Sequence, residues 1–134
     1  MNRRRKKGTD LTFSALSRVN AKRSNSWHGD AEPWSLADWA IALGGEAGEV
    51  LNAVKKLKRL RTGIKSSKGP QNIQQALDDI AEEITDVVFY ADLFMTALGR
   101  KMPVELQKKF NAISKREGFK EMIRLGRYSR EYGS

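Results

Sequence analysis

The chain has 134 residues, enough for one domain with its own apolar core. It contains no cysteine, which excludes disulfide bonds and thiolate metal sites and is typical of a cytoplasmic protein. The formal net charge is +9, but Arg3–Lys7 alone supplies five positive charges, and acidic residues concentrate in residues 78–92. A basic protein with a central acidic region is suited to polyanions held through cations, whereas that region opposes binding of bare DNA. No apolar run is long enough to span a membrane, and the basic N-terminus lacks the apolar stretch of a secretory signal.

The N-terminal part of the chain has the weakest helical pattern. Residues 1–8 are expected to form a basic flexible tail, and residues 9–120 one all-α domain. The first helix is predicted over about Asp10–Arg23, with Thr9 as its N-cap and a loop over residues 24–33 after it. Its expected apolar contacts are Leu11, Leu16 and Val19.

The second helix has clear start and stop signals. Ser35 is predicted as the N-cap, and Asp38 lies at the third helical position, where its carboxylate can reach the free backbone N–H groups. Gly63 is expected to end the helix shortly after Arg61. Apolar residues repeat at spacings of three and four, which predicts a stripe that packs on another helix. The stripe consists of Leu36, Ala40, Leu43, Ala47, Val50, Val54 and Leu57.

The third helix is predicted over about Gln71–Leu98, with a stripe of the same period. This stripe consists of Leu77, Ile80 or Ala81, Ile84, Val87, Ala91, Phe94 and Leu98. Pro103 can open a fourth helix that ends at Gly118, and residues 121–134 are expected to be a partly helical tail. Strand patterns are nearly missing, so the sequence predicts an all-α bundle with short connections.

Two acidic pairs are the main candidates for chemistry. Glu46 and Glu49 lie three residues apart in the second helix, and Glu83 and Asp86 repeat this spacing in the third, so each pair shares one helix face. If the two stripes pack against each other in antiparallel helices, both pairs meet at one interface. The carboxylates then repel one another, and bound divalent cations relieve the repulsion. Ligands made only of oxygen favour Mg²⁺, for which Mn²⁺ can substitute.

Either pair alone is more often a solvated helix surface than a binding site, so the neighbouring residues decide between the two. Gly44, Gly45 and Gly48 surround the first pair, although a glycine inside a helix lowers its stability by about 1 kcal/mol relative to alanine. This loss is tolerated where something approaches the backbone closely. The second pair lies among the apolar residues of 81–88, at the boundary of a core. Together these surroundings favour a metal site.

A di-iron bundle would also use glutamates that face inward. It requires Glu-x-x-His pairs, and the one histidine of the chain, His28, is predicted to lie in the loop before the second helix. The sequence therefore excludes a di-iron centre of this kind.

Polar residues continue along the second helix beyond the acidic pair. Asn52 follows Glu49 by three residues and Lys56 follows Asn52 by four, so all three share a side, and Arg59 lies one turn further on. Such cations can hold the oxygens of a phosphate chain. A solvated helix end, which the helix macrodipole favours for basic residues, is an equally good interpretation.

Aromatic residues lie near both acidic pairs. Trp39 precedes Glu46 by seven residues and shares its face, where it could stack on a nucleobase. Tyr90 follows Asp86 by one turn and either points into the same cavity or belongs to the core. His28, beside a tryptophan, is either a plain loop residue or a substrate contact.

Several of these segments, taken together, resemble MazG-like nucleotide pyrophosphohydrolases of phage and bacterial type. Two paired acidic motifs occur in the expected order, followed by a closing helix. The similar segments, within residues 27–119, are Trp34–Ala40, Leu43–Val50, Lys55–Leu57, Glu82–Tyr90, Lys109–Ser114 and Gly118–Phe119. The stretch from Val50 to Glu82 is longer than is usual in the family, and the extra length is expected in the loop over residues 63–72.

The resemblance implies a four-helix-bundle-like fold and cleavage of a nucleoside triphosphate between its α and β phosphates, giving a monophosphate and pyrophosphate. It also implies that a homodimer or homotetramer completes the pocket across subunits. In the mechanism that we expect, either Glu46 or Glu49 accepts a proton from the attacking water. The metal ligands map onto Glu46, Glu49, Glu83 and Asp86. Lys109 and Asn111 match positions that meet phosphates or the nucleoside.

Two other classes of function compete with the enzyme. In the first, a basic helical module without hydrolase activity binds nucleic acid through Arg3–Lys7 and the lysine-rich helix ends, which leaves the acidic pairs unexplained. In the second, a helical adaptor holds a structural metal. Neither a membrane partner nor nucleic acid is expected, and the sequence does not identify the base or the sugar of a substrate.

Overall fold

The computed structural model describes residues 11–64 and 66–125, so the predicted basic tail and residues 126–134 lie outside the described residues. Four helices and no strand occur in the described ranges, which confirms the all-α prediction. The helices are α1 (Phe13–His28), α2 (Leu36–Arg61), α3 (Ile73–Ala97) and α4 (Met102–Glu117). None of them is both long enough and apolar enough to cross a membrane.

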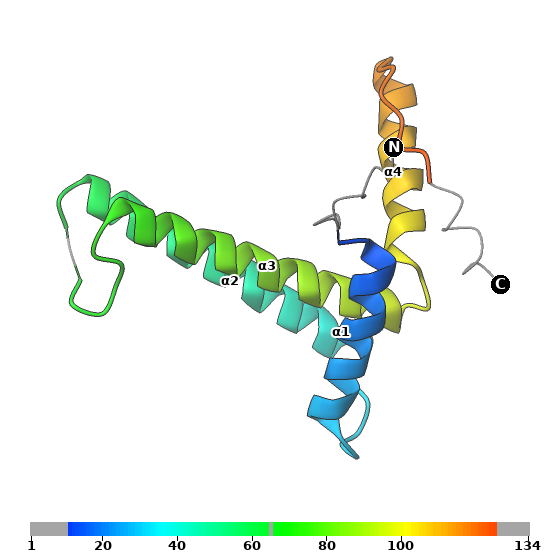
Figure 1. Ribbon diagram of the computed structural model, residues 1–134, viewed down its shortest axis with the longest axis horizontal. Helices are drawn as coiled ribbons and strands as arrows, with labels where there is room; N and C mark the ends of the chain where they lie inside the picture. The colour runs from blue at the N-terminus through cyan, green and yellow to red at the C-terminus, as the bar shows by residue number, and fades with distance from the viewer. Residues whose placement is uncertain (1–10, 65, 126–134) are drawn as a thin grey trace, which may run out of the picture.

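The two long helices form an arm. α2 and α3 lie side by side along their lengths, joined at the far end by residues 62–72, and they therefore run antiparallel (Figure 1). α1 and α4 lie crosswise at the other end of the arm, where α1 packs mainly on α3. The four-helix-bundle-like arrangement is not formed within one chain and stays a prediction for an assembly.

α1 differs from its predicted bounds at both ends. Thr12, rather than Thr9, caps its N-terminus, because the Thr12 hydroxyl accepts a hydrogen bond from the Ala15 N–H at 3.1 Å. The helix continues to His28 and ends at Gly29, whose φ of 55° is readily adopted only by glycine. His28 is therefore helical, and its prediction as a loop residue was wrong. The predicted apolar contacts also fail in part, since Leu11 is 69% and Val19 57% exposed.

The start of α2 agrees with the sequence. The Ser35 hydroxyl accepts from the Asp38 N–H at 3.2 Å, and the Asp38 carboxylate accepts from the Ser35 N–H at 2.8 Å. This reciprocal arrangement satisfies backbone donors that have no partner within the helix. The Ser35 hydroxyl also donates to the Asp38 carboxylate at 2.7 Å, and this bond, followed by the one from the Ser35 N–H, holds the pKa of Asp38 below its ordinary value.

One row of residues on each long helix forms their contact, called here the seam. α2 packs substantially only on α3, so the half-buried and buried residues of α2 mark its side of the seam. Most of them follow spacings of three and four, as a helix–helix contact requires, whereas Ala42 and Asn52 are half-buried outside this row. The seam contains Leu43, Glu46, Val50, Ala53, Leu57 and Leu60 of α2, and Ala76, Ile80, Glu83, Val87 and Tyr90 of α3. Glu46 and Glu83 thus take positions that an apolar residue would normally occupy.

Much of the predicted apolar stripe is not buried. Within the two helices of the arm, only Ala53, Leu57 and Ala76 are buried apolar residues. Each helix of the arm packs lengthwise on one neighbour, so it covers one narrow row and leaves the adjacent row open. The exposed large apolar residues of the arm are Leu36, Ile41, Leu51, Val54, Ile73, Leu77, Ile84, Val88 and Leu98. The expectation that the two stripes cover each other was therefore wrong for Leu36, Ala40, Ala47, Val54, Leu77, Ile84 and Leu98.

The segment after α4 folds back along that helix. Asn111 donates to the Ile123 carbonyl at 3.0 Å and accepts from the Ile123 N–H at 2.8 Å, and Gln107 donates to the same carbonyl at 3.2 Å. Residues 121–125 form no helix.

The capping interaction of α2 predicts a measurable loss of stability. Ser35→Ala removes the hydroxyl from the capping box and should lower the free energy of unfolding by about 1 kcal/mol. Urea denaturation at a fixed protein concentration measures this change. Ser67→Ala is the control, because Ser67 is exposed in the loop between α2 and α3 and its hydroxyl bonds to no described residue. An equal loss in both variants would contradict the capping role.

Candidate metal centre

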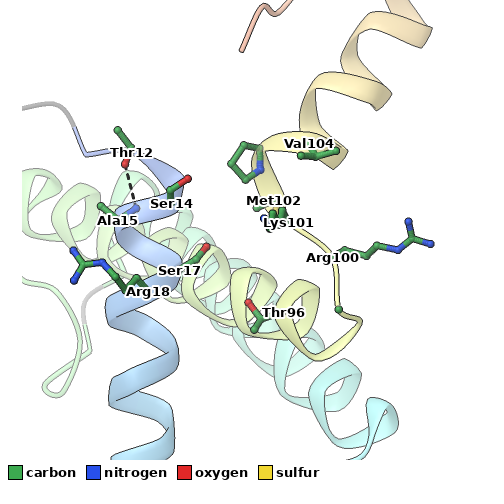
Figure 2. Close-up of a pocket in the computed structure, with 12 residues that line it drawn as sticks. Thr12, Ser14, Ala15, Ser17, Arg18, Thr96, Arg100, Lys101, Met102 and Val104 are labelled. Atoms are coloured by element: carbon green, nitrogen blue, oxygen red, sulfur yellow. Dashed lines mark hydrogen bonds between the residues drawn. The ribbon is translucent and has the colours of Figure 1, made fainter. Parts of the chain in front are cut away.

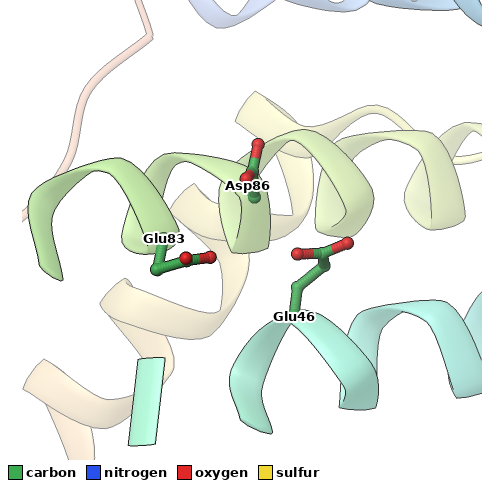
Figure 3. Close-up of side chains that lie close together, drawn as sticks. All are labelled: Glu46, Glu83 and Asp86. Atoms are coloured by element: carbon green, nitrogen blue, oxygen red, sulfur yellow. The ribbon is translucent and has the colours of Figure 1, made fainter. Parts of the chain in front are cut away.

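Three carboxylates converge on the seam. One oxygen each of Glu46, Glu83 and Asp86 lies within 4.8 Å of the others, and all three residues are half-buried. Figure 3 shows Glu46 on α2 close to Glu83 and Asp86 on α3. These residues, called here the carboxylate cluster, come from helices that the 62–72 loop joins, so the antiparallel packing of the arm brings them together.

Nothing in the described chain neutralises this cluster. Within residues 11–64 and 66–125, none of the three carboxylates takes part in a hydrogen bond or an ion pair. Burial, followed by the negative charges of Asp86, Glu83 and Glu49, raises the pKa of Glu46 above its ordinary value of 4.5. Four acids therefore interact electrostatically, and protons or cations can relieve their repulsion.

The donor set fits a hard divalent cation. Adjacent oxygens on one magnesium ion bound at about 2.1 Å lie about 3 Å apart. Three carboxylate oxygens that lie within 4.8 Å of one another would therefore have to close by up to about 2 Å, which side-chain rotation can supply. Oxygen-only ligands favour Mg²⁺ or Mn²⁺ over softer metals. Glu46, Glu83 and Asp86 can therefore hold such an ion.

Glu49 lies beside the cluster rather than in it. It is exposed on α2, and its oxygens are not among the atoms that meet within 4.8 Å. Its charge nevertheless contributes to the raised pKa of Glu46. The structure thus groups three of the four predicted ligands, and the assignment of Glu49 as a ligand stays a prediction.

An aromatic cavity adjoins the cluster and shares Asp86 with it. Its volume is about 260 Å³. The His28 ring meets the Trp34 ring edge-on at 4.8 Å between centroids, and the Trp34 and Trp39 centroids lie 4.6 Å apart. The lining residues are Asn20, Arg23, Ser24, Trp27, His28, Trp34, Trp39, Asp86, Phe89, Tyr90 and Leu93. Trp39, His28 and Tyr90, each a predicted substrate contact, therefore share one cavity with a carboxylate of the cluster.

The predicted cations of α2 lie elsewhere in the single chain. Lys56 follows Glu46 by ten residues, which corresponds to about 15 Å along a helix. Lys56 and Arg59 line a hollow of only about 50 Å³ beside the 62–72 loop. Asn52 is half-buried one turn from Glu49 and makes no hydrogen bond within the described residues. Within one chain, this loop and these cations lie away from the cluster, and their substrate contacts stay predictions.

The predicted contacts on α4 are also distant from the cluster. Asn111 uses both ends of its side-chain amide on the Ile123 backbone, so its side chain has a structural role within the chain. Lys109 is exposed on α4, which lies crosswise to the arm (Figure 1). One chain does not bring either residue to the carboxylates.

The glycines of α2 do not line the cluster. Gly44 and Gly48 each lie two residues from Glu46, which places them on the opposite side of the helix. A Cβ atom added at Gly44, Gly45 or Gly48 would meet no described atom within 4 Å. The close approach expected there does not occur within the described chain, so the glycines give no support to the metal site.

The sequence interpretation missed three residues of α1 and α3 that build this region. Asn20 and Asp92 are 3% and 1% exposed, and Arg23 lines the aromatic cavity. Asp92 accepts hydrogen bonds from the Ser17 hydroxyl and, at 3.0 Å, from the Asn20 amide. The signal was present in the sequence, because an acid that interrupts the apolar run of residues 87–98 must either find partners or lose its charge.

A cavity larger than the aromatic one lies away from the carboxylates. Its volume is about 580 Å³, and it opens between the start of α1, the end of α3 and the start of α4 (Figure 2). No acidic residue lines it, whereas Arg18, Arg100 and Lys101 do. A magnesium site cannot be built from these residues.

Fold and site together define a class: an all-α protein with a carboxylate cluster in a helix–helix seam and an aromatic cavity beside it. A scan against protein-family models finds no match for this chain, and a search of curated proteins finds none either. The resemblance to MazG-like enzymes therefore depends on the sequence motifs and stays a prediction.

The cluster predicts stabilisation by metal that depends on pH. An acid whose pKa is raised in the folded state stabilises that state while protonated and loses this contribution as the pH rises. Without metal, stability should therefore fall as the pH rises through and above 4.5, the ordinary pKa of Glu46. At pH 7, saturating Mg²⁺ should raise Tm by about 5 °C or more. Differential scanning fluorimetry measures both effects.

Asp86→Asn should raise the Tm of the metal-free protein and remove the gain from Mg²⁺. Asp78→Asn is the matched control, because Asp78 is an exposed acid of the same helix outside the cluster. A Mg²⁺ gain that survives in Asp86→Asn would show that the ion binds elsewhere.

Proposed function

We propose that this protein is a magnesium-dependent nucleoside triphosphate pyrophosphohydrolase that cleaves the bond between the α and β phosphates. The observation that carries the proposal is the cluster of Glu46, Glu83 and Asp86, which lacks a partner in the described chain and adjoins an aromatic cavity. A hard cation suits the carboxylates, and the same cation binds phosphate oxygens. The rings suit a nucleobase. A nucleotide satisfies both halves of the site at once.

The three clustered carboxylates would hold the metal. Bound magnesium supplies charge neutralisation at the phosphates and lowers the pKa of a coordinated water. Asp86 belongs to both the cluster and the cavity wall, so a ligand that bridges the two would carry its phosphates next to its base.

Glu49 is the better candidate for the proton acceptor. Glu46 is one of the three clustered carboxylates that would hold the metal. Glu49 is exposed beside the cluster, so its carboxylate remains accessible to water. In the proposed reaction, water gives a proton to Glu49 and its oxygen bonds to the α phosphorus. The bond from that phosphorus to the oxygen bridging the α and β phosphates breaks, and pyrophosphate leaves with the bridging oxygen.

The aromatic cavity would take the base. Trp39 lies two helical turns before Glu46 on the same face of α2, and the Trp34 and His28 rings pack around it. At about 260 Å³ the cavity is somewhat smaller than the usual range for small-molecule sites, about 300 to 1,000 Å³, and it is open to one side. It therefore suits one base, with the phosphates outside it at the carboxylates.

The exposed apolar rows of the arm favour a second copy of this chain as partner. Ile73, Leu77, Ile84 and Val88 recur on one face of α3 at spacings of four and seven, each 37% or more exposed. A row with this period is typical of a helix that packs on another helix. On α2 the open space at Gly44 and Gly48 lets a second helix approach closely. Homodimers and homotetramers would both cover these rows.

The proposal is tested by product analysis. Purified protein is incubated with Mg²⁺ and each of a panel of canonical and damaged nucleoside triphosphates, and the products are separated by ion-exchange chromatography. We expect a monophosphate and pyrophosphate in equal amounts from at least one substrate. Glu49→Gln should lower kcat by a factor of about 100 or more while keeping the Tm gain from Mg²⁺. Asp86→Asn should lose both the activity and the gain.

Three outcomes contradict parts of this proposal. No product from any nucleotide, at high protein concentration, would overturn the enzyme, and Mg²⁺ stabilisation without product would support an adaptor with a structural metal. Diphosphate and orthophosphate as products would place the cleavage between the β and γ phosphates. Undiminished turnover by Glu49→Gln would exclude it as the proton acceptor.

The assembly has its own test. Leu77→Lys places a charge in the exposed row of α3 and should shift the protein toward monomer in sedimentation velocity. Gln74→Lys, at an exposed polar position of the same helix, should leave the assembly unchanged. A wild-type protein that sediments as a monomer at every concentration would contradict the proposed assembly.

A further inference from the structure

A chain of hydrogen bonds crosses from α3 to α1 at the wall of the aromatic cavity. Asp92 accepts from the Ser17 hydroxyl and, at 3.0 Å, from the Asn20 amide nitrogen. The same nitrogen donates to the Phe89 carbonyl at 3.0 Å. Because both acceptors lie on the nitrogen side, the Asn20 side-chain oxygen is directed toward Arg23, whose guanidinium lies 3.5 Å from it.

Arg23 is exposed, and its hydrogen-bond and cation–π contacts within the described residues are with neutral groups. Its guanidinium lies 5.2 Å from the centre of the Phe89 ring, within cation–π range, and it contacts the Asn20 oxygen. It forms no ion pair with any described residue, although Arg23 and Asp86 line the same cavity. The cavity thus has a positive group and a negative group on its walls that do not neutralise each other.

We propose that Arg23 contacts the phosphate chain of the substrate, and that Asn20 and Asp92 are positioning residues that aim it. This inference rests on the proposed function, since it concerns the same site. In the proposed site, the base of the nucleotide lies among the aromatic rings and its phosphates lie near Asp86. Arg23 lines the same cavity, so its guanidinium is placed beside the phosphate chain. An arginine fork matches phosphate oxygens, and one fixed by uncharged partners keeps its full charge for them.

The direction of the Asn20 amide explains why a buried acid is present on α3. Asp92 and the Phe89 carbonyl are both acceptors, and together they exclude the flipped amide, which would turn its oxygen toward them and its nitrogen toward Arg23. With an apolar residue at position 92, the Phe89 carbonyl would be the one remaining acceptor for the Asn20 amide nitrogen on α3. Asp92 therefore acts on the substrate through Arg23 and does not touch it.

Direct binding measurements test the Arg23 contact. Calorimetry with inorganic triphosphate and Mg²⁺ reports the phosphate interaction without a base. Arg23→Gln should weaken this binding by about tenfold or more and raise KM for the preferred nucleotide by a similar factor. Arg18→Gln is the matched control, because Arg18 is an exposed arginine on α1 that lines the other cavity. It should change both values less than twofold.

Tryptophan fluorescence separates the phosphate contact from a contact with the base. The chain has three tryptophans, and all of them line the aromatic cavity. Quenching by the four common deoxynucleosides, which carry no phosphate, therefore reports base binding alone. Arg23→Gln should leave this quenching unchanged within twofold. An equal loss for nucleoside and inorganic triphosphate would overturn the phosphate contact in favour of a base contact or a structural role, and no loss of either would make Arg23 a solvated surface residue.

A double-mutant cycle tests the positioning residues. If Asp92 acts through Arg23, Asp92→Asn should weaken triphosphate binding on its own but add little in the Arg23→Gln background. Losses that add fully would assign Asp92 a structural role only. Should Asp92→Asn fail to fold, Ser17→Ala, which removes one donor to Asp92, replaces it in the same cycle.

The result for this inference is separate from the result for the enzyme. A wild-type protein that binds inorganic triphosphate with Mg²⁺ but hydrolyses no nucleotide would overturn the proposed hydrolysis, while the Arg23→Gln binding comparison still decides the phosphate contact. A hydrolysing protein whose triphosphate binding and KM do not respond to Arg23→Gln would overturn the inference alone.

Discussion

Repulsion among acids in the seam between α2 and α3 is the constraint on which the site depends. The seam is the largest packing surface of the described chain, and its regular spacing holds the arm together. Ala53, Leu57 and Ala76 are buried near the 62–72 loop, whereas Glu46 and Glu83 lie further along the arm. Packing therefore forces carboxylates together instead of letting them separate in solvent. Since no described cation pairs with these acids, protons or cations from solution are the groups that can relieve their repulsion.

Local signals in the sequence predicted the helices well where a cap or a glycine marks the end. Ser35 and Asp38 form the expected capping box, and Gly118 ends α4 in the left-handed conformation. α1 was predicted five residues too short at its end, because Ser24 and Asn25 favour turns by propensity. Packing on α3, including the Asn20 bonds to Phe89 and Asp92, overrides that local preference.

The sequence predicted the acidic residues of the candidate site but not the residues that surround them. The three-residue spacings of the acidic pairs, combined with antiparallel stripes, predicted the meeting of Glu46 with Glu83 and Asp86. The spacing could not separate Glu49 from them, because residues three apart share a face without sharing a point in space. The apolar period predicted burial but not the partner that provides it, so Leu77 and Ile84 lie exposed in the single chain. Periodicity describes one helix, whereas burial depends on the whole assembly.

α3 shows how the same chemical group takes opposite roles. Asp92 and Asp86 lie on one helix, six residues apart, and both are shielded from solvent to some degree. Asp92 is almost fully buried, and its charge is met by the Ser17 hydroxyl and the Asn20 amide, so it needs no cation. Asp86 is half-buried with no such donors and two acids near it. A carboxylate satisfied by neutral donors fixes structure, and one left without them recruits a ligand. Asn20 connects the buried Asp92 to Arg23, and Arg23 lines the cavity that also contains Asp86. The buried acid and the carboxylate cluster therefore belong to one arrangement.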